Sequence, residues 1–312
     1  MDRGSLMAVD AALQAIEAAG LAAGALDARR FALADGLPYR APGQPTLFVP
    51  YGHAIARVLQ TRGPVVTEGG AEASGLAAVA AAARLIARNE ADVVLAGASQ
   101  ALQRPVLDHL RAQGFAARSA AKPFDVSHAG MVPAEAAAYV VVESAAHARG
   151  RGATIRARIA GIGHVFDPSA EPLATSGPAE SGRAMQAALG DAGYLQNQVD
   201  LHFSCADGRE AVDDAEGYGA KRTFGRHAYY AGVTTVAGTL GHALAASGAL
   251  SLAFAVEALA RQEVFPVGGL DAPDREMDLA FVRESRAEKL DCVLVTSLGL
   301  GGANVSLVLA RE

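Results

Sequence analysis

The chain has 312 residues, of which 51% are hydrophobic, and a net charge of −6 from 27 basic and 33 acidic side chains. This acidic balance, without any basic cluster, argues against nucleic acid and against an anionic membrane surface as partners. Cys205 and Cys292 form no CxxC motif, so we expect no metal site, no disulfide framework and a cytoplasmic location. The N-terminal residues lack the continuous apolar core of a signal peptide.

Apolar periodicity predicts helices and strands that alternate along most of the chain. The predicted helices span residues 7–19, 52–61, 73–89, 182–192, 211–224 and 242–261. The predicted strands span residues 30–34, 64–67, 92–96, 137–143, 155–162 and 199–203, and two more flank a glycine-rich turn near the C-terminus. The longest apolar stretch, residues 243–256, is too short to span a bilayer and predicts a buried helix. Alternating helices and strands predict an α/β fold with mostly parallel or mixed sheets covered on both faces.

An internal repeat connects two of the predicted helices. Ser74-Gly75 and Ser247-Gly248 each begin an alanine-rich helical segment, and an Arg-Asn-Glu or Arg-Gln-Glu run follows each segment at the same spacing. Because alanine-rich helices resemble one another, chance is one explanation of the match. The other is a duplicated α/β unit, with halves at residues 1–165 and 166–312 and two central helices related by a pseudo-twofold axis.

Five segments with the character of motifs follow one another along the chain. They are GPVVTEGGAEASG (63–75), KPFDVSHAG with AEAAAYVVVE (122–143), SCADGREAVDDAEGYG (204–219), AGTLGHALAASGAL (237–250) and TSLGLGGANVSLVL (296–309). In this order they resemble the nucleophile helix, the RPFD…GEGAG…VLE stretch, the first and second histidine loops and the terminal glycine-rich hairpin of β-ketoacyl synthases, which are condensing enzymes of the thiolase type. The resemblance implies a dimeric, five-layered αβαβα fold built from two similar halves. The terminal glycine-rich run lies between strands and does not resemble a dinucleotide-binding turn, so no cofactor is expected.

The catalytic positions of that family are altered in this sequence. Alignment on the motifs places Glu72 at the position of the nucleophilic cysteine and Cys205 at that of the first histidine. Ala237 replaces the motif lysine, whereas His242 keeps the second histidine. Leu300 replaces the phenylalanine of the terminal glycine-rich turn. The resemblance therefore implies that no complete catalytic set is present.

The assignment of Cys205 rests on its spacing to Asp213 and Glu216. A slip of the alignment would let His202 serve as the first histidine, but it would lose this acidic spacing. The acidic residues of this segment also suggest a cation site, while the alternative is that they cap and solvate a helix; they are Asp207, Glu210, Asp213, Asp214 and Glu216.

Glu72 changes the chemistry expected at the nucleophile position. A cysteine at a helix N-terminus is converted to a thiolate by the local field and carries an acyl group as a thioester. A carboxylate is a weak nucleophile, and its acylation would give a labile anhydride. Glu72 is then a buried anion at a helix terminus, a general base in another reaction or a contact for a partner. His242 is either a hydrogen-bonded remnant or a catalytic group, and Cys205 is expected to be a small buried residue.

We therefore expect a non-condensing, ketosynthase-like subunit, known as a chain-length factor, of a type II polyketide synthase. Such subunits pair with a catalytic ketosynthase, on which the acyl carrier protein mainly docks, and they usually carry glutamine where this chain has Glu72. The compact form favours a highly reducing, polyene-making system. Phe48 and Leu300 are the expected pocket residues. The alternatives are a malonyl-carrier-protein decarboxylase that uses His242 and Glu72, a homodimeric pseudoenzyme, or another thiolase-fold acyl-transfer enzyme.

Two differences in length accompany the altered residues. The resemblance begins at an internal helix of the family, so the usual first strand has no counterpart in this sequence. The segment between Gly36 and Pro50 is also shorter than usual. We expect an abbreviated N-terminal half whose first sheet is incomplete and leaves apolar surface exposed.

Overall fold

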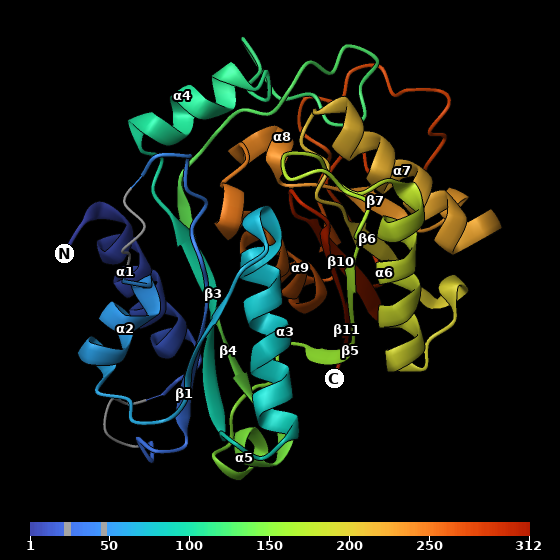
Figure 1. The fold of residues 1–312 in the computed structure, drawn as a ribbon. Helices are drawn as coiled ribbons and strands as arrows, with labels where there is room; N and C mark the ends of the chain where they lie inside the picture. The colour runs from blue at the N-terminus through green and yellow to red at the C-terminus, as the bar shows by residue number, and fades with distance from the viewer. Residues whose placement is uncertain (22–25, 45–48) are drawn as a thin grey trace.

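The computed structural model describes residues 1–21, 26–44 and 49–312. Two sheets lie on either side of a central pair of helices, and further helices cover the outer face of each sheet (Figure 1). The central helices are α3 (Ser74–Ala87) and α9 (Ser247–Arg261), and the outer helices are α1 (Arg3–Ala18), α2 (Tyr51–Leu59), α6 (Pro178–Ala192) and α7 (Glu210–Phe224). These five layers confirm the αβαβα architecture expected from the sequence.

The first sheet has four strands in the order β2-β1-β3-β4. They are β2 (Val65–Glu68), β1 (Phe31–Gly36), β3 (Val93–Gln100) and β4 (Ala136–Glu143). β1 is parallel to β2 and β3, and β4 is antiparallel to β3. Every residue of β1 and β3 is buried because helices cover both faces, which explains why these strands are continuous apolar or small-residue runs.

The second sheet repeats this topology and adds one strand, in the order β5-β11-β10-β6-β7. Its strands are β5 (Arg158–Phe166), β11 (Ala303–Ala310), β10 (Cys292–Leu298), β6 (Leu201–Phe203) and β7 (Gly232–Thr234). β6 is parallel to β7 and β10, whereas β11 is antiparallel to β10. β11 is thus the counterpart of β4, but in the part of the chain that the structure describes only β11 has a further strand, β5, on its other side. The boundary between residues 165 and 166 stays a prediction; it falls within β5, which pairs in the second sheet.

The backbone at the two central helices confirms the internal repeat. A short 3-10 helix precedes each one, Ala71–Ala73 before α3 and Leu244–Ala246 before α9. Both 3-10 helices begin at a non-glycine residue with positive φ, 50° at Ala71 and 47° at Leu244. Matching left-handed residues follow the helices, with φ of 57° at Asn89 and 55° at Gln262. Shared conformations of this rare kind indicate a duplicated unit.

Two glycines allow the central helices to approach closely. A Cβ added to Gly75 would lie 2.6 Å from the carbonyl oxygen of Ala245, and one added to Gly248 would lie 2.9 Å from Cβ of Leu76. Both distances are too short for real contacts, so the Ser-Gly pairs of the repeat are required by helix packing. This packing fixes the N-terminal ends of α3 and α9 beside each other.

The predicted elements agree with the structure except at a few places. The helix predicted from residue 242 begins at Ser247, because Leu244 is left-handed and the next residues form a 3-10 helix. The strand predicted over residues 155–162 is shifted to Arg158–Phe166, and α4 (Arg104–Ala112) was not predicted. The short elements α5 (Ala145–Gly150), α8 (Ala237–Leu240), β8 (Glu263–Val264) and β9 (Arg286–Ala287), with 3-10 helices at Gln196–Gln198 and Gly225–Tyr229, complete the described chain.

The apolar segment Leu244–Arg261 is long and apolar enough to cross a membrane by composition alone. In the fold it forms the central α9 and the turn before it, and 61% of it is buried inside the protein. Leu252, Ala255 and Leu259 pack in the core between the two sheets. The hydrophobicity of this segment is therefore explained by its place in the α/β core.

Candidate active site

Glu72 lies in the turn between β2 and α3, at the N-terminal end of the central helix, and is only 2% exposed. Its Oε2 atom accepts a hydrogen bond of 3.1 Å from the backbone N–H of Leu300 in the terminal glycine-rich turn. Its Oε1 atom lies 3.0 Å from Nη2 of Arg209. Both carboxylate oxygens at the nucleophile position are thus held by groups from the second half of the fold.

Arg209 is a buried cation placed between two carboxylates. It precedes α7, and its Nη2 atom lies 2.8 Å from Oδ2 of Asp207 as well as 3.0 Å from Glu72. The guanidinium carbon also lies 5.4 Å from the centre of the Phe115 ring, a cation–π contact. Burial alone would lower the pKa of Arg209, but Asp207 and Glu72 raise it above the ordinary value. Arg209 therefore stays charged.

Asp207 completes the pairing from the other side of the guanidinium. It is fully buried and accepts hydrogen bonds from the backbone N–H of Arg209 at 3.0 Å and from its Nε at 2.9 Å. Burial raises the pKa of Asp207, but Arg209 and then His242 outweigh it, so the pKa lies below the usual value. The site therefore places the Arg209 cation between the carboxyl groups of Asp207 and Glu72, so the buried cation is not left without an acidic partner.

His242 borders this cluster without completing a catalytic set. Its Nε2 atom lies 3.7 Å from Oδ2 of Asp207, and its backbone N–H donates to the carbonyl of Val132 at 2.8 Å. Burial, opposed by Asp207, lowers the pKa of His242 below 6.5, so the imidazole is neutral at pH 7. Among the described residues its Nδ1 atom has no hydrogen-bond partner.

The two candidates for the first histidine position, Cys205 and His202, lie in different elements of the structure. Cys205 lies on the loop that leads to Asp207, and its backbone N–H donates to Glu216 at 3.2 Å. Burial, and next the Glu216 carboxylate, raise the pKa of its thiol well above the ordinary value, so no thiolate forms at pH 7. His202 lies in β6, where its Nε2 atom is 3.0 Å from Oγ1 of Thr296. The slipped alignment that would use His202 is thereby disfavoured.

Two acidic residues of this segment hold the loop in place. Asp213 accepts the backbone N–H groups of Asp207 and Gly208 at 3.1 Å each. Glu216 accepts the hydroxyl of Ser204 at 2.8 Å and the backbone N–H of Cys205. Within the described parts of the chain, no group of three acidic, histidine or cysteine residues is arranged to hold a metal ion. Asp213 and Glu216 are buried within α7 and bind the loop before it, and the helix has no side-chain cap at Arg209, so these two residues neither solvate nor cap the helix.

The remaining predicted positions are placed only in part. Leu300 is buried in the turn between β10 and β11, where its amide reaches Glu72, and its role in a pocket stays a prediction. Ala237 begins α8, is buried and carries no charge to the site. Phe48 lies outside the described residues.

Sequence reasoning missed the pairing of Arg209 with Glu72. The signal was the segment Ala-Asp-Gly-Arg at 206–209, where the resembled histidine loop has Gly-Thr-Gly-Thr. Two charged residues in place of two threonines, in a buried loop, require partners of opposite charge. Because the motifs already placed Glu72 at this site, it was the natural acidic partner for Arg209.

The fold and the site define a protein of the ketosynthase type within the thiolase fold. The model of the β-ketoacyl synthase N-terminal domain matches residues 52–148, and that of the C-terminal domain matches residues 156–271. Since these matches cover more than half of the chain, the chain belongs to the β-ketoacyl synthase family.

Individual relatives and solved structures agree with this assignment. The chain is 36% identical over 270 residues to 3-oxoacyl-[acyl-carrier-protein] synthase 2 of Coxiella burnetii, covering 80% of this chain and 62% of the relative. It is 33% identical over 332 residues to nodulation protein E of Rhizobium meliloti, covering 98% of this chain and 82% of that protein. The chain spans 62% of the length of the Coxiella burnetii synthase, which is less than two thirds, and the same share of a polyketide β-ketoacyl synthase of Streptomyces halstedii.

A β-ketoacyl synthase structure from Burkholderia phymatum superposes with a TM-score of 0.92 at 27% identity, covering 100% of this chain and 83% of that one. The ishigamide ketosynthase/chain length factor superposes with a TM-score of 0.90 at 24% identity, with the same coverage. The second likeness concerns the fold alone.

Proposed function

We propose that this chain is a non-condensing subunit of the chain-length-factor type, which pairs with a catalytic ketosynthase in a type II polyketide synthase. The observation that carries the proposal is the Glu72 carboxylate at the nucleophile position, bound by Arg209 and by the Leu300 amide. A highly reducing, polyene-making system and a cytoplasmic location are parts of the same proposal. The chain would shape the acyl pocket, and the partner would carry the acyl group and the main contacts with the acyl carrier protein.

The pairing of Glu72 removes three requirements of acyl transfer. Arg209 lowers the nucleophilicity of the carboxylate by holding its negative charge. The Leu300 N–H is a donor of the kind that stabilises a developing oxyanion, and Glu72 already occupies it. The nearest carboxylate oxygen to the His242 Nε2 atom is that of Asp207 at 3.7 Å, and among the described residues no ion pair or hydrogen bond joins His242 to Glu72. A covalent acyl intermediate on this chain is accordingly disfavoured.

The edge of the first sheet beside Glu72 supports the pairing with a partner. β2 is the strand that leads directly into the Glu72 turn, and within the described residues it pairs only with β1. Its side chains are half-buried or exposed, in contrast to the fully buried β1 and β3. An unpaired edge invites another strand, and a stable obligate interface of this kind would bury about 2,000 Å² or more.

Co-expression tests the pairing directly. The chain expressed alone should be poorly soluble, and co-expression with the ketosynthase encoded beside it should yield a soluble 1:1 complex by size-exclusion chromatography and sedimentation. A matched co-expression with a homodimeric ketosynthase from another system controls for a general chaperone effect. A stable, well-behaved monomer at micromolar concentration would contradict the obligate partner.

A decarboxylase of malonyl-carrier protein is the second candidate, and one observation favours it. The imidazole of His242 is neutral, and its Nδ1 atom has no hydrogen-bond partner among the described residues. In the tautomer with a proton on Nδ1, this atom can donate a hydrogen bond to a substrate oxygen. Release of carbon dioxide from malonyl-carrier protein by the chain alone, abolished in His242→Ala, would establish this activity. The proposed function predicts no release above the buffer control.

A further inference from the structure

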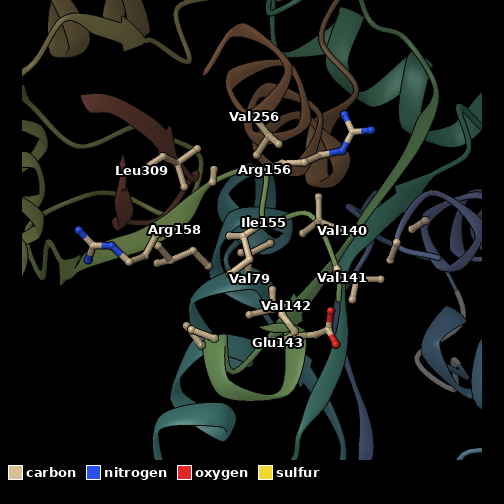
Figure 2. Close-up of a pocket in the computed structure, with 18 of the residues that line it drawn as sticks. Val79, Val140, Val141, Val142, Glu143, Ile155, Arg156, Arg158, Val256 and Leu309 are labelled. Atoms are coloured by element: carbon tan, nitrogen blue, oxygen red, sulfur yellow. The ribbon is translucent and has the colours of Figure 1, made fainter. Parts of the chain in front are cut away.

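An apolar groove of about 650 Å³ lies between β4 and the central helices, at the end of the first sheet next to α5 (Figure 2). Val79 and Val256 line it from the centre of the molecule, and the chain's own segment 153–159 borders it. The groove is therefore a space between the layers of the fold. Residues 122–131 and 205–213 do not line it, so the contact between these two segments is a separate feature.

Residues 126–131, which we call the covering segment, pack against residues 205–209 of the candidate site, which we call the site loop. The backbone N–H of Gly130 donates to the carbonyl of Gly208 at 2.8 Å. The two backbones are so close that a Cβ added to Gly208 would lie 2.6 Å from the Gly130 carbonyl oxygen. The residue after the covering segment accepts the backbone N–H of His242 at 2.8 Å. The covering segment therefore borders the candidate site on this side.

Asp213, in the first turn of α7, joins the two segments through both of its carboxylate oxygens. Its Oδ1 atom accepts the backbone N–H groups of Asp207 and Gly208 in the site loop at 3.1 Å each. Its Oδ2 atom accepts the backbone N–H of Phe124 at 2.8 Å and lies 3.1 Å from Nδ1 of His128 in the covering segment. One fully buried carboxylate thus holds the site loop with one oxygen and the covering segment with the other.

Phe124, just before the covering segment, has a strained backbone. Its φ is 62°, in the left-handed region that a bulky side chain rarely adopts. The residue is fully buried, and its ring centre lies 5.0 Å from that of Phe281. Strain of this kind persists only where several contacts hold the residue in place. Weakening the bonds to Asp213 therefore favours movement of the adjoining covering segment.

His128 is the group of this contact that titrates near neutral pH. The charged groups that face it are carboxylates of α7: Asp213 in contact, and Glu210 and Asp214 at longer range. Burial raises the pKa of Asp213, but its partners are all donors, which an ionised carboxylate accepts. The hydrogen bond with Asp213 raises the pKa of His128 above 6.5. The pair is therefore charged below pH 6.5 and loses the His128 charge as the pH rises through the folded-state pKa.

We propose that His128 and Asp213 form a pH-sensitive latch, which is closed while His128 is protonated and opens more often as His128 loses its proton. In the closed state the ion pair holds the covering segment against the site loop. In the neutral state the contact between His128 and Asp213 loses its charge and weakens, whereas the site loop keeps its two bonds to Asp213. The covering segment is therefore the part that is released. The latch does not depend on the proposed function.

Hydrogen exchange of the covering segment tests the latch in the full chain, alone or in the co-expressed complex. Exchange rates at about pH 6 and about pH 8.5 are divided into the intrinsic rate at each pH, which gives the protection of each amide. The N–H groups of Gly130 and Met131 bond to the carbonyls of Gly208 and Phe115. Their protection should fall at least about fivefold from the lower to the higher pH. Residues 292–298 of β10 report global unfolding, and their protection should not fall.

Variants at two histidines assign the effect. His128→Gln removes the titratable group, so protection should be as low at both pH values as in wild type at the higher one. His128→Arg keeps a permanent charge and should be protected at both. His147→Gln is the matched control, because His147 also contacts a carboxylate, that of Glu143 at 2.7 Å, and it should keep the wild-type pH dependence. Equal protection of the wild type at both pH values would overturn the proposal, and so would a pH dependence that persists in His128→Gln.

Discussion

Nη2 of Arg209 lies 3.0 Å from Oε1 of Glu72, and this buried ion pair joins the N-terminal end of α3 to the N-terminal end of α7. It links the two halves of the fold at the position where the β-ketoacyl synthase family carries its nucleophile. The same carboxylate accepts a hydrogen bond from the backbone N–H of Leu300. Glu72 therefore both stands at the nucleophile position and uses the backbone donor beside it. The site is stabilised as a charged contact between the halves.

Removing the cation should destabilise the protein strongly. Arg209→Met leaves Glu72 and Asp207 buried without their partner, and breaking such a pair costs about 3–5 kcal/mol. Urea unfolding followed by circular dichroism measures the change. The control is Arg156→Met, whose pair with Glu257 is half exposed and should change stability by less than about 1 kcal/mol. Equal effects of the two variants would contradict the structural role of the Arg209 pair.

Restoring the nucleophile should not restore condensation. In Glu72→Cys the site still has Cys205 and Ala237 at the first histidine and lysine positions, and residues that act as a unit are not recovered singly. Arg209 and Asp207 also remain in place beside the new thiol. Chromatography with mass detection should find no ketoacyl product when the variant is supplied with acyl- and malonyl-carrier protein. Product made without a partner subunit would show that the remaining site suffices.

Stability should depend on the protonation of His242. Burial lowers its pKa in the folded chain below 6.5, so below that pH the unfolded chain binds a proton that the folded chain does not. The free energy of unfolding is then fully retained above pH 6.5 and decreases as the pH falls below it. His242→Gln should have a smaller decrease between pH 6.5 and 5, measured by urea titrations at each pH.

Asp35 changes the pH dependence of the free energy of unfolding in the opposite direction to His242. The effect of His242 must therefore be measured as the difference between wild type and His242→Gln. Burial raises its pKa to about 6, so this carboxyl favours the folded state at low pH and loses that contribution as the pH rises from 3.8 towards 6. Because Asp35 is present in both proteins, its effect cancels in the difference. Identical pH slopes for wild type and His242→Gln would contradict the assignment of His242 as a buried neutral imidazole.

Pocket residues should alter product length in the reconstituted complex. We expect Phe48→Ala to lengthen the product, because the family's corresponding segment lies near the acyl tunnel. Leu300→Ala removes side-chain volume beside Glu72 while keeping the backbone N–H that binds it, and it should act in the same direction. Product distributions are compared by mass spectrometry, with the exposed Ala187→Glu as control. Unchanged distributions in both variants would contradict control of chain length by this subunit.

Local sequence signals predicted most helices and strands well because the core elements are long and strongly apolar, whereas the five layers were expected from the family resemblance. The Ser-Gly repeat at Ser74 and Ser247 left open whether the two helices are related or match by chance, and the structure supports the first, since glycine is required where the helices touch. α4 was missed although its apolar residues have helical spacing, because it is polar on average, only nine residues long and has Pro105 near its start. The start of α9 was placed too early because the left-handed backbone at Leu244 leaves no mark in apolar periodicity.

Contacts between distant segments limited what the sequence could show of the site. The motif spacing placed Glu72, Cys205 and His242, but the partner of Glu72 lies far along the chain and replaces a threonine of the resembled motif. The choice between His202 and Cys205 depends on which residue leaves the strand, and β6 ends at Phe203, between them. Such questions are decided by tertiary packing, so local patterns cannot answer them.

Intact-protein mass spectrometry of the complex tests the central claim most directly. The chain and its ketosynthase partner are incubated together with acyl-carrier protein thioester, separated under denaturing conditions, and each subunit is weighed. We predict an acyl adduct on the partner alone, with this chain at its unmodified mass because Glu72 stays bound to Arg209. A stoichiometric acyl adduct on this chain would contradict its assignment as the non-condensing subunit.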